Sequence, residues 1–257
     1  MTAVIFFLYG LIIGSFLSVC IYRLPKKESI IFPRSQCPNC LQPIRWYDNI
    51  PLISYLLLRG RCRFCHNPIS PLYPLVEGLN GTLFALLYLR YSISFQLFIY
   101  LLLASGLLVL IFIDLRHRLL PNYLTLPGVG LGFLLSFVNP GVEWWDSLLG
   151  IALGGGLLLL VATAYYWWRK VEGMGMGDVK LMAMVGAFLG WKLTLMTIVL
   201  GSLLGSLVGL GLILKRGADF RTALPFGAFL GSAAIGSLLF GQELINSYLT
   251  LIRGAIF

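Results

Sequence analysis

The sequence predicts an all-α polytopic membrane protein with about eight transmembrane helices and a small cytosolic zinc-knuckle insert between the first two. Of its 257 residues, 58% are hydrophobic and only 11% are charged, whereas soluble domains carry about 25% charged residues. The apolar residues form runs of about 20, the length that crosses a bilayer as a helix. A single long polar segment holds four of the five cysteines. Ordinary soluble folds are therefore excluded.

The first apolar run is expected to be a retained transmembrane helix. Its charges follow the run instead of preceding it, which is the reverse of a secretory signal peptide. Seven further apolar segments follow along the chain. The expected helices cover residues 2–22, 74–91, 95–114, 122–138, 147–168, 179–191, 193–214 and 224–250, and the sixth is the shortest.

The distribution of positive charge gives the expected orientation. If the N-terminus is periplasmic, 16 of the 19 Lys and Arg residues lie on the cytosolic side, as the positive-inside rule requires. The exceptions are Arg90, Lys192 and Arg253. A net charge of +9 is also compatible with binding to nucleic acid. However, the basic residues lie in short segments between apolar runs, so we expect a lipid bilayer and no nucleic acid as the partner.

The polar segment 23–73 carries a metal-ligand pattern, and its cysteines have the spacing C-x2-C-x21-C-x2-C. Two cysteines three residues apart on a tight turn direct both thiolates to one point, and two such turns complete a tetrahedral site. The ligands of the predicted zinc are Cys37, Cys40, Cys62 and Cys65. Disulfides would need an oxidising compartment, and a redox pair would need a neighbouring βαβ unit. Zinc is favoured, with redox cysteines as the alternative.

Two aspartates stand at the ends of predicted helices, both on the expected cytosolic side. Asp114 ends the third span, and Asp178 opens the sixth after Gly175 and Gly177. Each alone is compatible with a solvated loop acid. Together they are the minimum for aspartic-protease chemistry, in which an ionised carboxylate takes a proton from water while a protonated one polarises the carbonyl. The glycines permit positive φ and close approach of a substrate backbone.

The helix ends also suggest a division of roles. The dipole at a helix N-terminus favours the carboxylate of Asp178, and the dipole at a C-terminus disfavours that of Asp114. Asp178 is therefore expected to be the base and Asp114 the neutral donor. A phosphate-binding loop at the same glycines is disfavoured, because no strand precedes them and Lys180 does not fit the motif.

In order along the chain, these motifs resemble those of the prepilin leader peptidases (type IV prepilin peptidase/N-methyltransferases). Gly175-Met176-Gly177-Asp178 is similar to their G-x-G-D motif, and Asp114 with Leu120-Pro121-Asn122 is similar to their first aspartate segment. The two C-x2-C pairs and Tyr73-Pro74-Leu75-Val76-Glu77 resemble their cytosolic insert, and Pro225-Phe226-Gly227 resembles a loop near their end.

The resemblance implies an inner-membrane aspartic endopeptidase with Asp114 and Asp178 as its catalytic pair. Its substrates would be prepilins or the pseudopilins of type II secretion, cut at the cytosolic interface, typically between Gly and Phe. S-adenosylmethionine would then methylate the new N-terminus, although no G-x-G-x-x-G marks a site for this cofactor. The expected divisions are a first helix (1–22), the zinc-binding insert (23–73) and the membrane-embedded peptidase domain (74–257).

Two other functions are compatible with the same residues. A transporter would use intramembrane acids to bind cations near the bilayer midplane. A non-enzymatic assembly factor of a secretion system would not need Asp114 or Asp178. Glu77, near the start of the second span, is interpreted as an interfacial acid, with support of catalysis as the alternative.

Overall fold

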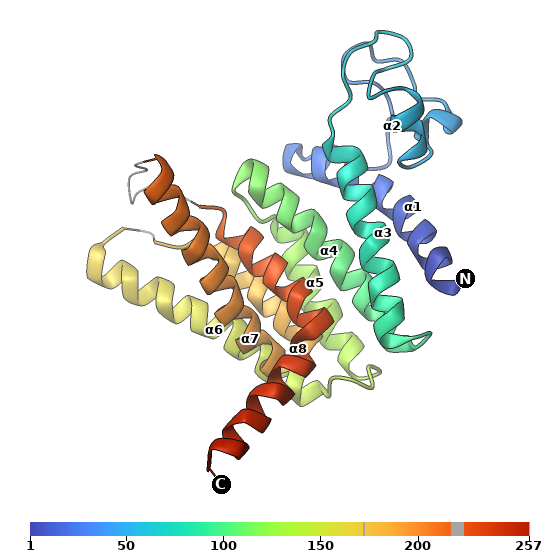
Figure 1. The fold of residues 1–257 in the computed structure, drawn as a ribbon. Helices are drawn as coiled ribbons and strands as arrows, with labels where there is room; N and C mark the ends of the chain where they lie inside the picture. The colour runs from blue at the N-terminus through green and yellow to red at the C-terminus, as the bar shows by residue number, and fades with distance from the viewer. Residues whose placement is uncertain (172, 217–223, 257) are drawn as a thin grey trace.

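The fold is a bundle of long helices with a small domain at one end (Figure 1). The computed structural model describes residues 1–171, 173–216 and 224–256. Within these ranges there is no β-strand, only two isolated bridges. The long helices are α1 (Thr2–Arg23), α3 (Leu72–Tyr91), α4 (Phe95–His117), α5 (Asn122–Ser136), α6 (Trp144–Arg169), α7 (Met176–Arg216) and α8 (Phe226–Ile256). The predicted all-α membrane fold is confirmed.

Six of these helices (α1, α3, α4, α6, α7 and α8) are long and apolar enough to cross a membrane. The fourth predicted span corresponds to α5, which has only 15 residues. The sixth and seventh predicted spans both lie in α7, where Gly190 interrupts the helical backbone with φ 74° and ψ 174°. Each of the eight predicted segments is therefore helical.

The contacts of α7 with α8 show that the chain reverses at Gly190. Near the start of α7, Asp178 lies beside Gly227, at the start of α8. Just past Gly190, Leu193 contacts Gly241, far along α8. Later in α7, Gly209 lies beside Leu224, immediately before α8. The two halves of α7 therefore run in opposite directions, as two separate passes require.

α4 forms the centre of the bundle, since 78% of the residues in its most apolar stretch of 18 are buried. Leu107, Leu110 and Ile113 of α4 join Leu181 of α7 and Leu230 of α8 in one hydrophobic core. The predicted end of this helix at Asp114 is three residues early. The observed helix ends at His117, because Arg118 takes a left-handed conformation (φ 52°) and donates its N–H to the Asp114 carbonyl.

α6 packs against α7 through glycines that let the two backbones touch. A Cβ on Gly150 would collide with the backbone of Gly186, and the reverse also holds. Small residues at such a crossing permit the close helix packing found in membranes. This contact fixes the first half of α7, which carries Asp178.

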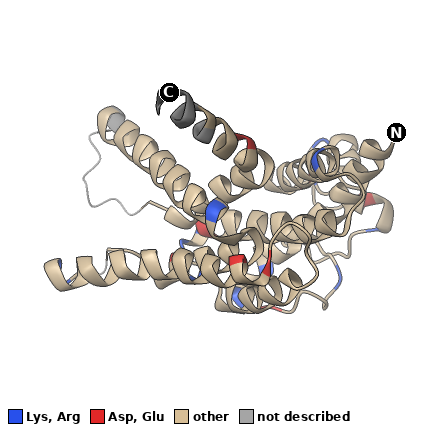
Figure 2. Cartoon of the chain, turned by 90° about the horizontal axis from the view of Figure 1, so that it is seen from below, with Lys and Arg blue, Asp and Glu red and all other residues tan. Residues whose placement is uncertain are grey.

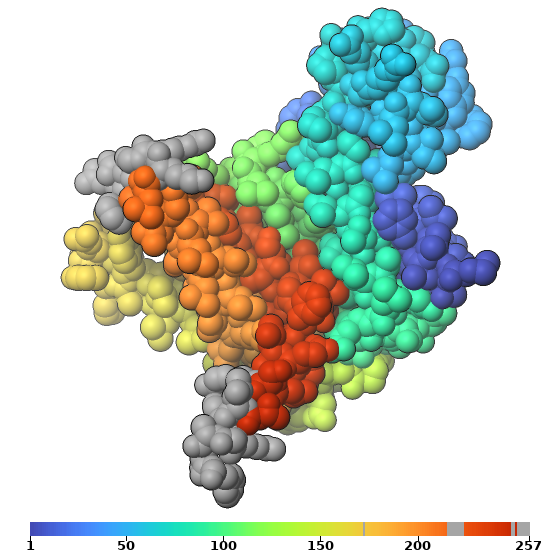
Figure 3. Space-filling model, viewed as in Figure 1, coloured from blue at the N-terminus to red at the C-terminus, as the bar shows by residue number. Residues whose placement is uncertain are grey.

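The insert projects beyond the helical bundle from the ends of α1 and α3 (Figures 1 and 3). It contains the short helix α2 (Ile53–Leu57) and the 3-10 turns η1 (Leu24–Lys26) and η2 (Trp46–Asn49), joined by irregular chain. A segment of this size buries too little surface for a large core, so it depends on other sources of stability.

Most of the helical ribbon carries no charged residue (Figure 2), and eight of the Lys and Arg residues lie from Arg23 to Arg63. Arg90 and Lys192 line one cavity at one end of the bundle, and Arg23 and Arg116 line another beside the insert. The structure thus places these two pairs in different cavities. Arg221, also expected on the cytosolic side, lies outside the described residues.

Candidate active site and metal site

Asp114 lies in the last turn of α4 and is buried, with 5% of its surface exposed. Its Oδ2 accepts a hydrogen bond from the backbone N–H of Ala228 at 2.8 Å. Ala228 is in the first turn of α8, where backbone N–H groups have no partner within their own helix. The N–H of Ala228 is therefore shared between the Asp114 carboxylate and the Pro225 carbonyl, which lies 3.2 Å away.

Asp178 lies in the first turn of α7 and is also buried, with 8% exposed. Its own N–H donates to the carbonyl of Gly175 at 3.1 Å, which closes the turn that begins the helix. Gly177, just before it, faces Leu120, whose Cβ would lie 2.9 Å from a Cβ on Gly177. A larger residue at 177 would therefore displace the turn or Leu120.

The two carboxylates converge at Gly227. A Cβ on this glycine would lie 2.9 Å from Asp178 Oδ1 and 3.0 Å from Asp114 Oδ2. The two oxygens are therefore at most the sum of these distances, 5.9 Å, apart. This span is small enough for one water molecule to hydrogen-bond to both carboxylates. The structure thus brings together the two aspartates that sequence reasoning selected.

The structure adds a contact that the helix-dipole argument for the roles of Asp114 and Asp178 did not include. Asp178 is at a helix N-terminus as predicted, but Asp114 receives an N–H from the N-terminal turn of a second helix, α8. A hydrogen bond from a backbone N–H favours the ionised carboxylate. The C-terminus of α4 therefore no longer singles out Asp114 as the neutral partner.

Gly175, before Asp178, leaves room beside the carboxylate, and neither Gly175 nor Gly177 has a positive φ. Among the described glycines only Gly60 and Gly190 have positive φ. At Gly175 a Cβ would meet nothing closer than 3.9 Å, and Asp178 Oδ2 would be 4.0 Å away. The positive φ that glycine permits is therefore not used at this motif, whereas the room beside the carboxylate agrees with a backbone approaching there.

The sequence analysis assigned no role to three residues of the site. Gly227 and Ala228 meet the carboxylates, and Asn122 accepts a hydrogen bond from Lys180 Nζ at 2.8 Å, which ties α5 to α7. The Pro225-Phe226-Gly227 motif was a signal for the first two. The Leu120-Pro121-Asn122 motif was the signal for Asn122. Neither motif predicts which hydrogen bonds these residues form.

All four cysteines of the insert gather in one group, with their sulfur atoms within 4.8 Å of one another. The Sγ atoms of Cys37 and Cys65 are 3.8 Å apart, and those of Cys40 and Cys62 are 4.0 Å apart. A tetrahedral zinc with Zn–S bonds of about 2.3 Å places its sulfurs about 3.8 Å apart. A disulfide needs about 2.05 Å. The geometry fits a four-cysteine metal site and not a disulfide pair.

The two knuckles share one backbone pattern. Cys37 N–H donates to Gln42 O, and Leu41 N–H returns to Cys37 O with Leu41 at φ 58°. The second knuckle repeats this pattern. Cys62 N–H donates to Asn67 O, and His66 N–H donates to Cys62 O with His66 at φ 54°. Backbone N–H groups of Cys65 and Phe64 lower the pKa of the Cys62 thiol to about 7. In the same knuckle the N–H of Asn67 lowers the pKa of the Cys65 thiol, but burial and the other three thiols outweigh it and raise that pKa to about 11. The surroundings therefore favour a thiolate, the form that binds metal, at Cys62 and not at Cys65.

Neither His66 nor Cys20 belongs to this group. His66 is exposed at the end of its knuckle, and Cys20 is buried within α1. Both positions agree with the sequence-based interpretation of His66 as a neighbour of the site and Cys20 as a buried apolar residue.

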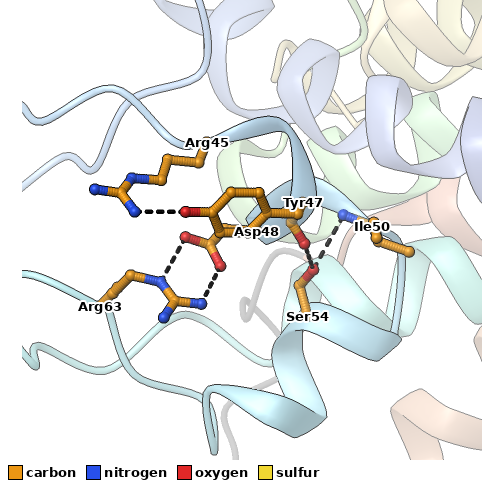
Figure 4. Close-up of polar contacts among 6 residues, drawn as sticks. All are labelled: Arg45, Tyr47, Asp48, Ile50, Ser54 and Arg63. Carbon is orange, nitrogen blue, oxygen red and sulfur yellow. Dashed lines mark hydrogen bonds and ion pairs between the residues drawn. The ribbon is translucent and has the colours of Figure 1, made fainter.

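Two acids stabilise the insert. Glu77 of α3 is buried, and its Oε2 accepts the N–H of Leu52 at 2.9 Å, which holds the start of α2 against the bundle. Asp48 forms a bidentate pair with Arg63, at 2.8 and 2.6 Å (Figure 4). This guanidinium keeps the pKa of Asp48 below its ordinary value. The structure gives Glu77 a part in docking the insert.

The chain matches two family models. Residues 8–91 match the bacterial peptidase A24 N-terminal domain, and residues 101–210 match the type IV leader peptidase family. A prepilin leader peptidase/N-methyltransferase of Aeromonas hydrophila is 39% identical over 95% of this chain and 92% of its own length. This chain belongs to the type IV leader peptidase family. A relative of the same description from Pseudomonas aeruginosa is 36% identical over 94% and 91% of the two chains.

A third relative of the same description, from Myxococcus xanthus, is 43% identical over 84% of this chain and 64% of its own length. No solved structure is significantly similar to the chain. Both aspartates lie in the part that matches the type IV leader peptidase family, and all four cysteines lie in the part that matches the N-terminal domain. Family membership favours the peptidase hypothesis over the transporter and assembly-factor alternatives.

Proposed function

We propose that this chain is a prepilin leader peptidase of the bacterial inner membrane that also methylates the N-terminus it releases. The convergence of Asp114 and Asp178 at Gly227 is the observation that carries the peptidase activity. The names of the 36–43% identical relatives support both activities. The substrates are prepilins or pseudopilins.

Asp114 and Asp178 are the proposed catalytic pair. Two carboxyl groups this close share a proton, because like charges at short range cannot both ionise. The ionised carboxylate takes a proton from water while the water oxygen bonds to the peptide carbonyl carbon. The protonated carboxyl polarises the carbonyl oxygen. The C–N bond then breaks, its electron pair stays on nitrogen, and a proton from the pair converts that nitrogen to the new amine.

The position of the pair suits a membrane-anchored substrate. A prepilin has a basic leader followed by an apolar helix, so its cleavage site lies at the membrane interface. Asp114 and Asp178 lie in terminal turns of their helices, which we assign to the cytosolic side by the distribution of Lys and Arg, with the N-terminus periplasmic. Holding both partners in one membrane replaces a search in three dimensions by local positioning.

The insert is proposed to bind one structural zinc ion through Cys37, Cys40, Cys62 and Cys65. The sulfur spacing supports a tetrahedral site, and the small size of the insert supports a stabilising role for the metal. The methyl donor is proposed to be S-adenosylmethionine. When bound, this cofactor would supply a methyl group to the N-terminal amine that cleavage releases, and the amine would give up one proton.

The test is mass spectrometry of a prepilin incubated with the purified full chain in lipid nanodiscs. With S-adenosylmethionine present, we expect loss of the leader and gain of one methyl group on the new N-terminus; without it, only loss of the leader. An intact prepilin in a preparation that retains its metal would overturn the peptidase. A cleaved but never methylated product would leave the peptidase and remove the second activity.

A further inference from the structure

We infer that the cavity between the insert and the membrane helices is the binding site for S-adenosylmethionine. This inference rests on the proposed methyltransferase activity and gives it a location. The cavity has a volume of about 770 Å³ and is bounded by the ends of α1 and α3, by both cysteine knuckles and by Arg116 of α4. Sites for small molecules and cofactors usually measure about 300–1,000 Å³.

The charges in the wall match a ligand that carries both signs. Asp48 and Arg63 line the cavity but neutralise each other in their bidentate pair. The acids Glu28 and Glu77 remain, together with the cations Arg23 and Arg116. S-adenosylmethionine carries a sulfonium, an ammonium and a carboxylate. The two acids suit its cationic groups, and a guanidinium suits its carboxylate.

Aromatic rings in the wall suit the rest of the ligand. Tyr22, Phe32 and Tyr73 line the cavity, and such rings stack on adenine and attract a sulfonium as they attract other cations. The ring of Tyr22 already holds a cation, since Lys26 Nζ lies 3.8 Å from its centroid. This ring therefore attracts positive charge, with one of its faces occupied by Lys26.

The position of the cavity agrees with the order of the two reactions. The amine that receives the methyl group is the product of cleavage, so the donor must bind close to the aspartates. Arg116, in the cavity wall, follows Asp114 by two residues on the same helix, which is a rise of about 3 Å. The cavity and the aspartate pair therefore lie at the same end of α4, on different faces of that helix.

The basic leader of a prepilin is a weaker candidate for this cavity. A basic peptide favours a wall with excess negative charge, whereas the acids and the arginines here balance. Cys37 and Cys62 belong to the wall, so a metal bound to the knuckles would hold one side of the cavity in shape. Loss of the metal is therefore expected to weaken binding of the methyl donor, although the metal site is separate from the aspartate pair.

The experiment measures equilibrium binding of radiolabelled S-adenosylmethionine to the purified full chain in nanodiscs, with leader cleavage measured on the same preparations. Tyr22→Ala removes an aromatic wall. Tyr9→Ala is its matched control, because Tyr9 lies on the same helix and is 60% exposed but does not line the cavity. Glu77→Gln removes one charge at nearly constant shape. Asp178→Asn, outside the cavity, separates binding from cleavage.

We expect Tyr22→Ala and Glu77→Gln to weaken binding at least tenfold, and by more than they slow cleavage, while Tyr9→Ala and Asp178→Asn bind as the unmodified chain does. Equal binding by all four variants would overturn the location and leave the methyltransferase intact. Impaired leader binding with normal cofactor binding would assign the cavity to the substrate. An unmodified chain that neither binds the cofactor nor methylates would instead remove the methyltransferase itself.

Discussion

The backbone N–H of Ala228 lies 2.8 Å from Oδ2 of Asp114, and this hydrogen bond joins the first turn of α8 to the last turn of α4. The neighbouring residue, Gly227, lies against both carboxylates. The start of α8 is therefore the third component of the proposed active site, because it positions one carboxylate and leaves room between the two.

Gly227→Ala is expected to abolish leader cleavage in a folded protein. The added methyl group would lie 2.9 Å from Asp178 Oδ1 and 3.0 Å from Asp114 Oδ2, in the space that a water or a substrate carbonyl needs. A displacement of about 1 Å at a reacting centre costs about 10²-fold in rate. The measurement is the initial rate of prepilin cleavage.

Gly236→Ala is the matched control for this substitution. It changes the same residue type on the same helix, and its Cβ would meet nothing within 4 Å. We expect cleavage close to the unmodified rate. Full activity of Gly227→Ala would show that the space between the carboxylates is not used.

Much of this architecture could be predicted from the sequence. The apolar runs located eight helical segments, and the cysteine spacing predicted that the four thiols gather in one group, because both depend on local patterns. The contact between Asp114 and Ala228 joins residues 114 positions apart, and no local pattern fixes how α8 begins relative to α4. The helix-dipole argument for the roles omits this contact, since it considered only the helix that contains Asp114.

Metal analysis of the purified chain is expected to give about one zinc ion per chain. Cys62→Ser should lower that content strongly, because it removes one of four sulfurs that lie within 4.8 Å of one another. Cys20→Ser is the control, since Cys20 is buried in α1 outside the group. Unchanged zinc in Cys62→Ser, or no metal in the unmodified chain, would return the cysteines to the redox alternative.

Gly190→Ala is expected to destabilise the bundle. Gly190 has φ 74° and ψ 174°, a conformation open almost only to glycine, so a side chain there costs about 1–3 kcal/mol. Its Cβ would also lie 3.3 Å from Asp146 Cβ. A lower midpoint of thermal unfolding in detergent is the expected result.

Gly211→Ala, also in α7, is the comparison for Gly190→Ala, because a Cβ there would have no neighbour within 4 Å and Gly211 lacks positive φ. It should unfold at nearly the same temperature as the unmodified chain. Equal midpoints for both variants would contradict the reversal of α7 at Gly190.

Asp48→Asn is expected to weaken the insert at neutral pH. The pKa of Asp48 is lower in the folded protein than its ordinary value, so its pair with Arg63 contributes stability above the unfolded pKa and loses it as the pH falls through the folded pKa. The difference between Asp48→Asn and the unmodified chain should therefore stay constant between about pH 6 and 8, where Asp48 is fully ionised in both states.

Denaturant unfolding measures this difference by fluorescence when Trp46, which lies near Asp48 in η2, is kept as the one tryptophan and the other five are replaced by Phe. High salt should reduce it, since the Arg63 side chain is 45% exposed. A difference that grows as the pH falls would have the wrong sign for a carboxyl group with a lowered pKa.

The most direct test of the central claim is the rate of prepilin cleavage by purified Asp114→Asn and Asp178→Asn variants in nanodiscs, compared with Asp146→Asn. Asp146 is an acid of α6 that lines the cavity with Arg90 and Lys192, at the other end of the bundle. We predict a loss of about 10²–10⁴-fold for each of the first two variants and near-normal cleavage for the third. Normal cleavage by either Asp114→Asn or Asp178→Asn would contradict the account.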